Sequence, residues 1–128
     1  EWMRRCWIIT DRSIILKEYN LLLATINSII SDGSREKQKD FLAYGLKMLR
    51  SCLHYNLGNR QLVKHTAYEM EFIANFSRYI HTNNIQSFEE EFNKAVFHIE
   101  RNVAGNLVFT DLSHIVARLL KIAPPAKQ

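Results

Sequence analysis

The sequence has very little proline and little glycine. Both prolines, Pro124 and Pro125, fall within the last five residues, and only four glycines are spread over 128 positions. All-β sandwiches and barrels need turn residues at intervals of about 8–12 positions, so this composition argues against them. Phosphate-binding loops need clustered glycines, because backbone N–H groups must approach the ligand closely. The sequence accordingly contains no Walker motif and no dinucleotide-binding fingerprint.

Cysteine and long apolar runs are also scarce. The two cysteines, Cys6 and Cys52, lie in apolar patterns, which predicts buried thiols in a reducing compartment rather than a disulfide framework. No apolar run reaches the ~18 residues of a membrane span, and the N-terminus lacks the pattern of a signal peptide. We therefore expect a cytoplasmic protein without membrane contact. Residue 1 is Glu1 rather than methionine, so we expect a processed chain or a piece of a longer one.

The residue types that carry chemistry are present but not grouped. None of the five histidines has a second histidine four positions away, so the sequence predicts no zinc site. Cys52 and His54 are two positions apart and do not face each other on a helix. The run 89–91 of three glutamates spreads around a helix and is expected to be a solvated first turn. The sequence thus predicts no catalytic residue, cofactor, metal or small-molecule substrate.

The apolar residues recur with helical spacing along nearly the whole chain. This periodicity predicts an all-α fold, a single helical bundle domain of five to six helices over 1–123 with a flexible tail at 124–128. Gly33 and Ser34 predict a helix end followed by a helix start, and a capping box is expected at Thr66 and Glu69. The expected helices cover about 1–9, 12–31, 34–57, 66–80, 84–102 and 106–121.

The last two predicted helices carry clear apolar stripes. The first of these is expected to bury Ile85, Phe88, Phe92, Ala95, Val96 and Ile99. The second is expected to bury Leu107, Val108, Leu112, Ile115, Val116 and Leu119. The sequence predicts a polar break near His81–Asn84, before the first of these helices, and another at Gly105–Asn106, between the two. Four aromatic residues are candidates for partial exposure at an interface: Trp2, Trp7, Tyr55 and Tyr68.

The densest polar run is 35–39, with Arg35, Lys37 and Lys39. Together with three arginines near the N-terminus it is a candidate basic face for nucleic acid in a chain of net charge +4. Two other interpretations stay open, a solvated helix start and a contact face for another protein.

Several short stretches resemble one family when taken in order. GSREKQKDFL at 33–42 resembles a Gly-Arg-Glu-Lys-Gln-Lys-x-Phe-Leu segment of the delta-prime clamp-loader subunit of bacterial DNA polymerase III, in its Bacteroidetes-type form. HIERNVAGNLVFTDL at 98–112 is similar to the end of the same subunit. The opening Trp2-Met3-Arg4-Arg5-Cys6 and Asn83-Asn84-Ile85 also match that family. The resemblance covers about 2–120.

The resemblance implies the collar domain of a clamp loader, a pentamer that opens a ring-shaped clamp and places it on primed DNA. The implied partners are the other clamp-loader subunits, while DNA and the clamp are contacted only indirectly. The ATPase-type domain would be absent from this chain, so no enzymatic activity of its own is expected. Interface or family-motif positions implied by the match are Trp2, Arg35, Lys37, Lys39, Arg101 and Asn102. Arg101 and Asn102 are expected to define the turn between the last two helices.

Two other functions remain open from the residues alone. A stand-alone helical nucleic-acid-binding module would use the face at 35–39 and would lose affinity steeply with salt. A helical enzyme would need a site assembled from scattered residues, and no motif supports it.

Overall fold

The computed structural model describes residues 24–30, 34–63 and 65–125, and all of their regular structure is helical. No strand occurs in these ranges, which confirms the predicted all-α bundle. The elements are a helical segment at 24–30, α3 (Arg35–Asn56), η1 (Arg60–Leu62), α4 (Ala67–Phe76), η2 (Ser77–Tyr79), α5 (Ile85–Glu100) and α6 (Gly105–Leu120). None of the helices in these ranges is long and apolar enough to cross a membrane.

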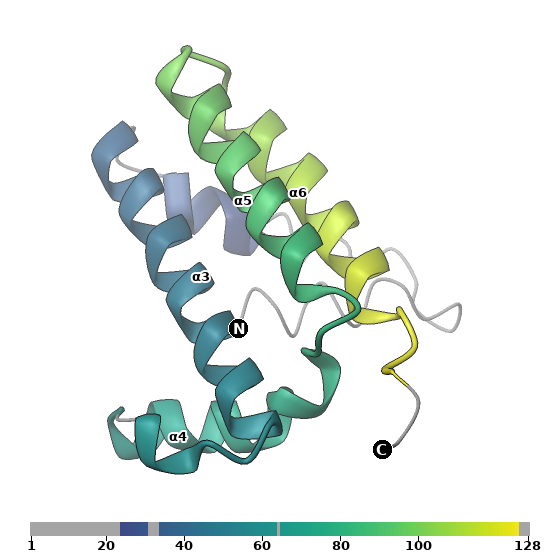
Figure 1. Ribbon diagram of the computed structural model, residues 1–128. Helices are drawn as coiled ribbons and strands as arrows, with labels where there is room; N and C mark the ends of the chain where they lie inside the picture. Colours follow the sequence, from purple (N-terminus) through teal and green to yellow (C-terminus); the bar gives the residue numbers. More distant parts are fainter. Residues whose placement is uncertain (1–23, 31–33, 64, 126–128) are drawn as a thin grey trace.

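Three long helices lie side by side and alternate in direction. α5 packs against both α3 and α6 and runs antiparallel to each, while α4 crosses the carboxyl end of α3 (Figure 1). The bundle therefore has two distinct ends. At one, which we call the turn end, the first residues of α3 (34–40) meet the connection between α5 and α6 (97–107). At the other lie η1, η2 and the carboxyl ends of α3 and α6.

Local signals in the sequence account for the helix starts. The Ser34 hydroxyl accepts a hydrogen bond from the backbone N–H of Lys37 at 3.3 Å, so Ser34 begins α3 as predicted. Thr66 and Glu69 form the predicted capping box at the start of α4. That helix is shorter than expected: it ends at Phe76, and the chain continues as η2 rather than as a helix to residue 80.

The end of α3 depends on a glycine. Gly58 has φ 89°, a left-handed conformation that costs least without a Cβ. The N–H of Asn59 bonds the carbonyl of His54 at 2.9 Å, and that of Gly58 bonds the carbonyl of Tyr55 at 3.1 Å. This is a Schellman motif, and it turns the chain into η1.

The core lies between α3, α5 and α6. Of the stripe predicted for α5, Phe88, Phe92, Ala95 and Ile99 are buried, while Ile85 and Val96 are half-buried. On α6, Val108, Leu112 and Val116 are buried as predicted and Ile115 and Leu119 are half-buried, but the prediction is wrong for Leu107. Leu107 is 63% exposed, whereas Phe109 is fully buried and packs in a T-shaped arrangement against Phe41, with the ring centres 5.8 Å apart. Leu107 lies on a side of the first turn of α6 that the other helices leave uncovered, whereas Gly105, Val108 and Phe109 lie on covered sides.

The segment between η2 and α5 is more buried than its polarity suggests. Asn84 is fully buried, and its carbonyl oxygen accepts from the backbone N–H of His81 at 3.0 Å. Its amide donates to the carbonyls of Tyr79 at 2.9 Å and Leu119 at 3.0 Å. The Nε2 atom of His81 lies 3.1 Å from the carbonyl oxygen of Ile122. The predicted polar break is therefore the connection that holds the carboxyl end of α6.

Cys52 behaves as the buried thiol that its apolar pattern predicts. It is fully buried in α3, and this burial raises the pKa of the thiol from 9.0 to about 12. At a pH near 8 its thiolate fraction is thus about a thousandfold below that of an exposed cysteine. We expect alkylation by iodoacetamide, followed by peptide mass spectrometry, to label Cys52 only after unfolding in urea. Labelling of this peptide within minutes in the folded protein would contradict its placement.

Candidate functional site

The turn end brings together residues that are about 60 positions apart in the sequence. The Lys39 Nζ atom lies 3.1 Å from a carboxylate oxygen of Glu36 and 3.5 Å from one of Glu100. The hydrogen bond to Glu36 is the main reason that the pKa of Lys39 is raised. Lys39 therefore stays charged and links α3 to the last residue of α5.

A second contact at the turn end joins α3 to α6. Gln38 is buried although it is polar, and it lies under Gly105, the first residue of α6. A Cβ atom at residue 105 would stand 3.0 Å from the Ile30 side chain and 3.1 Å from the Gln38 amide nitrogen. Glycine thus permits the close approach of α6 to α3 and to the segment at 24–30.

The connection between α5 and α6 is a second Schellman motif. Arg101 caps α5, and Asn102 has a left-handed φ of 68°, which asparagine tolerates better than most residues. The N–H of Val103 bonds the carbonyl of His98 at 3.0 Å, and that of Asn102 bonds the carbonyl of Ile99 at 3.1 Å. Arg101 and Asn102 therefore sit where the direction of the chain reverses.

Three large apolar side chains stay exposed beside this turn. Phe97 is 48% exposed, Val103 39% and Leu107 63%. The guanidinium of Arg101 lies 4.2 Å from the centre of the Phe97 ring, a cation–π contact that fixes both side chains. We call Phe97, Val103 and Leu107 the turn patch.

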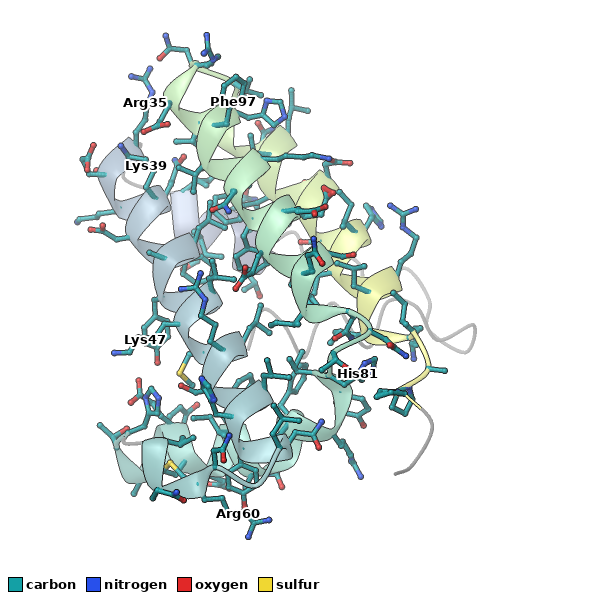
Figure 2. The ribbon with its side chains drawn as sticks, in the orientation of Figure 1. Arg35, Lys39, Lys47, Arg60, His81 and Phe97 are labelled. Atoms are coloured by element: carbon teal, nitrogen blue, oxygen red, sulfur yellow. The ribbon has the colours of Figure 1, made fainter. Side chains whose placement is uncertain are left out.

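Five of the six positions singled out in the sequence lie at the turn end. Figure 2 shows Arg35, Lys39 and Phe97 near one another at the tips of α3 and α5. Arg35 and Lys37 are exposed and Lys39 is half-buried, while Arg101 and Asn102 are in the turn. The sixth, Trp2, lies outside the described residues. Sequence reasoning did not single out Glu100, whose only signal was its place in the HIER motif.

A groove between α3 and α4 forms a second surface. It encloses about 300 Å³ and is walled by Phe41, Gly45, Met48 and Phe72 together with Ile29 of the segment at 24–30. Its rim carries Tyr44, Tyr68 and Glu69, and Tyr68 is 83% exposed. The sequence had marked Tyr68 as an interface candidate, but the groove itself needs two helices and was not predicted.

A chain of hydrogen bonds beside the groove has the order serine, histidine, glutamate. Ser51 Oγ lies 2.8 Å from His65 Nε2, and His65 Nδ1 lies 3.3 Å from Glu69. In a hydrolase such a serine stands beside free backbone N–H donors that stabilise an oxyanion. Ser51 instead lies within α3, and Glu69 is engaged by the capping box and by Tyr44. This cluster holds α4 against α3.

The protonation of this cluster should be visible in the pH dependence of stability. The Tyr44 hydroxyl donates to Glu69, and this bond is the main reason that the pKa of Glu69 falls from 4.5 to about 2. A carboxyl group with a lower pKa in the folded state stabilises the fold above its unfolded pKa. That contribution should disappear as the pH falls from 4.5 towards 2. The same bond raises the pKa of Tyr44 to about 12, so its contribution should be lost as the pH rises from 10 through 12.

We expect Tyr44→Phe to weaken the acid dependence, because it removes the main cause of the low Glu69 pKa. The measurement is urea unfolding, followed by circular dichroism, at a series of acidic pH values. Tyr68→Phe is the matched control, since Tyr68 is exposed on the same rim. The assignment is wrong if Tyr44→Phe unfolds with the pH profile of the unaltered protein.

The described residues contain no group of three or more histidine, cysteine, aspartate or glutamate side chains placed to hold a metal ion. Comparisons of this chain with models of protein families, with curated proteins and with solved structures found no match.

Proposed function

We propose that this chain is the collar domain of a bacterial clamp-loader subunit of the delta-prime type. In this proposal it joins neighbouring subunits of the loader that serves DNA polymerase III in the cytoplasm. It carries out no catalysis of its own, and its role in assembly requires no direct contact with the clamp. A collar subunit in a ring contacts two neighbours through two different surfaces.

The observation that carries the proposal is the presence of two separate apolar surfaces. The turn patch belongs to α5, α6 and the connection between them, whereas the groove belongs to α3, α4 and the segment at 24–30. They share no residue and no helix. Exposed large apolar residues that gather in patches are typical of protein–protein interfaces. Two such surfaces are what a subunit between two different neighbours needs.

A further observation supports the resemblance to the delta-prime subunit, on which this proposal rests. The two longest similar stretches, 33–42 and 98–112, meet at the turn end through the ion pair of Lys39 and Glu100. The contact of Gln38 with Gly105 joins the same two stretches. The two stretches that resemble the delta-prime subunit thus contact each other in the fold. Such contact is expected if both stretches belong to one structural unit of that family.

The alternative of a nucleic-acid-binding face at 35–39 is less favoured. Lys39, its last cation, is paired with Glu36 on α3 and Glu100 on α5, and Asp40, the next residue, adds a third acid. Phosphate binding relies on basic side chains that are available to the backbone of the nucleic acid. The positive charge of this face is largely balanced by the acids around it.

The test is association with the collar domains of the other clamp-loader subunits from the same bacterium. We expect complexes in sedimentation velocity at tens of micromolar, roughly the range of modest interfaces. Leu107→Asp should abolish binding of one neighbour and Tyr68→Asp binding of the other, because a charge would enter each apolar contact. Asn93→Asp, on an exposed position of α5, is the matched control and should bind both.

Absence of any complex with several different partner domains would count against the collar proposal. So would loss of the same single neighbour in both variants, because the two surfaces would then serve one contact.

A further inference from the structure

Three stretches at the end of the bundle opposite the turn end carry positive but no negative charges. They are 54–63, 74–84 and 112–125, while the neighbouring helix α4 carries Glu69 and Glu71. The three stretches contain Arg60, Arg78, Arg118 and Lys121. Their formal charge of four equals the net charge of the whole chain, +4. We call this surface the basic end.

Hydrogen bonds between side chains and backbone hold the three stretches together. The Asn56 amide donates to the carbonyl of Ile80 at 2.8 Å, which ties the end of α3 to the residue after η2. The Asn84 amide donates to the carbonyls of Tyr79 and Leu119, which ties η2 to the end of α6. The three stretches that carry these charges, far apart in sequence, are therefore joined at one end of the fold.

Two of the arginines are held by aromatic rings rather than by carboxylates. The Arg60 guanidinium carbon lies 4.4 Å from the centre of the Tyr55 ring, and that of Arg78 lies 5.0 Å from the centre of the Tyr79 ring. Both arginines are exposed, and within the described residues neither is ion-paired. Figure 2 shows Arg60 directed away from the bundle at this end.

A stacked guanidinium has a defined orientation while its N–H edges remain available. Such an edge donates two parallel hydrogen bonds to a phosphate or a carboxylate. Tyr55 and Tyr79 are the sequence neighbours of Asn56 and Ile80, whose hydrogen bond joins the end of α3 to the residue after η2. The basic end therefore offers two exposed guanidinium groups, each beside an aromatic ring.

We propose that the basic end binds a single-stranded nucleic acid through Arg60, Arg78 and Arg118. Single strands are bound by cations that follow the phosphates together with aromatic or guanidinium surfaces on which bases stack. An acidic peptide would use the charges but would not need the stacked planes. This binding goes beyond the proposed collar role, which uses the turn patch and the groove and expects only indirect contact with DNA.

The experiment is a titration of the whole chain into a fluorescent oligothymidylate of about 20 nucleotides, followed by anisotropy. We expect a dissociation constant of about 10–100 µM in 50 mM salt, in the range of non-specific binding. Three phosphate contacts on a single strand predict a slope of about −2 for log K against log salt concentration.

Arg60→Gln with Arg78→Gln should weaken binding about tenfold and reduce the slope by about 1.4. The matched control is Arg35→Gln with Arg101→Gln, which removes the same charge at the turn end and should change affinity less than about twofold. Circular dichroism checks that the variants fold. Arg118→Gln, on the exposed last turn of α6, is a second test and should reduce the slope by about 0.7.

Several results would overturn this inference. They are no saturable binding below about 1 mM, equal losses in the two double variants, equal binding of polyglutamate, or tighter binding of a duplex than of a single strand. Oligouridylate of the same length tests whether the site prefers RNA to DNA. A preference for either oligonucleotide supports a single-strand site and indicates which nucleic acid it binds. The titration needs no partner subunit, so a failure of collar assembly leaves its outcome unaffected.

Discussion

Asn84→Ala is expected to lower the free energy of unfolding by about 3 kcal/mol. Asn84 is fully buried and makes three hydrogen bonds to backbone atoms of His81, Tyr79 and Leu119. Alanine fills the site only partly and leaves those backbone groups with no replacement partner. Each unpaired buried group costs about 1–3 kcal/mol, reduced where water can enter. The carboxyl end of α6 should loosen first.

The matched control for this variant is Asn83→Ala. Asn83 is the exposed neighbour, and its amide donates only to the carbonyl of Ala123 at 3.2 Å. Its replacement should cost less than about 1 kcal/mol, because water can take over the bond. Urea unfolding followed by circular dichroism measures both variants. Equal stabilities of the two variants would show that the buried amide does not hold α6.

Phe109→Ala should destabilise the fold by about 4 kcal/mol, the range seen for large aromatic side chains in cores. The Phe109 ring is fully buried and packs in a T-shaped arrangement against the Phe41 ring on α3. Its removal takes apolar area from the core and leaves a cavity between α3 and α6. Phe41 also walls the groove, so this variant should alter that surface as well.

Leu107→Ala, two positions earlier on α6, is the control for this prediction. Leu107 is 63% exposed, so its truncation should change stability by less than about 0.5 kcal/mol. Thermal and urea unfolding of the two variants give the comparison. A larger loss for Leu107→Ala than for Phe109→Ala would mean that α6 is rotated about its axis relative to the structure.

The helices themselves follow from short-range features of the sequence. Ser34 and the pair Thr66 and Glu69 begin helices because their side chains bond N–H groups only three positions away. Along α5 the apolar residues cover a stripe that faces both neighbouring helices, and Phe88 and Phe92 are buried as their spacing predicts. Such features depend on residues within one or two helical turns, so they can be recognised without the fold.

The tertiary structure decides which residue of a mixed stripe is covered. On α6 the spacing admits both Leu107 and Phe109, and the position of α3 selects Phe109. Likewise Asn84 looks like part of a polar loop, yet the carboxyl end of α6 closes over it. Burial depends on which distant element packs there, and periodicity within one helix does not contain that information.

The candidate surfaces likewise depend in part on the sequence alone and in part on the fold. Sequence alone determined an all-helical chain with scattered polar groups, and it singled out basic residues such as Lys39. Only the fold paired Lys39 with Glu100, assembled the groove, and placed Arg60 and Arg78 on tyrosine rings at the opposite end of the bundle. The physical reason is that the charge of a surface is a sum over neighbours in space, and those neighbours are set by how the helices pack.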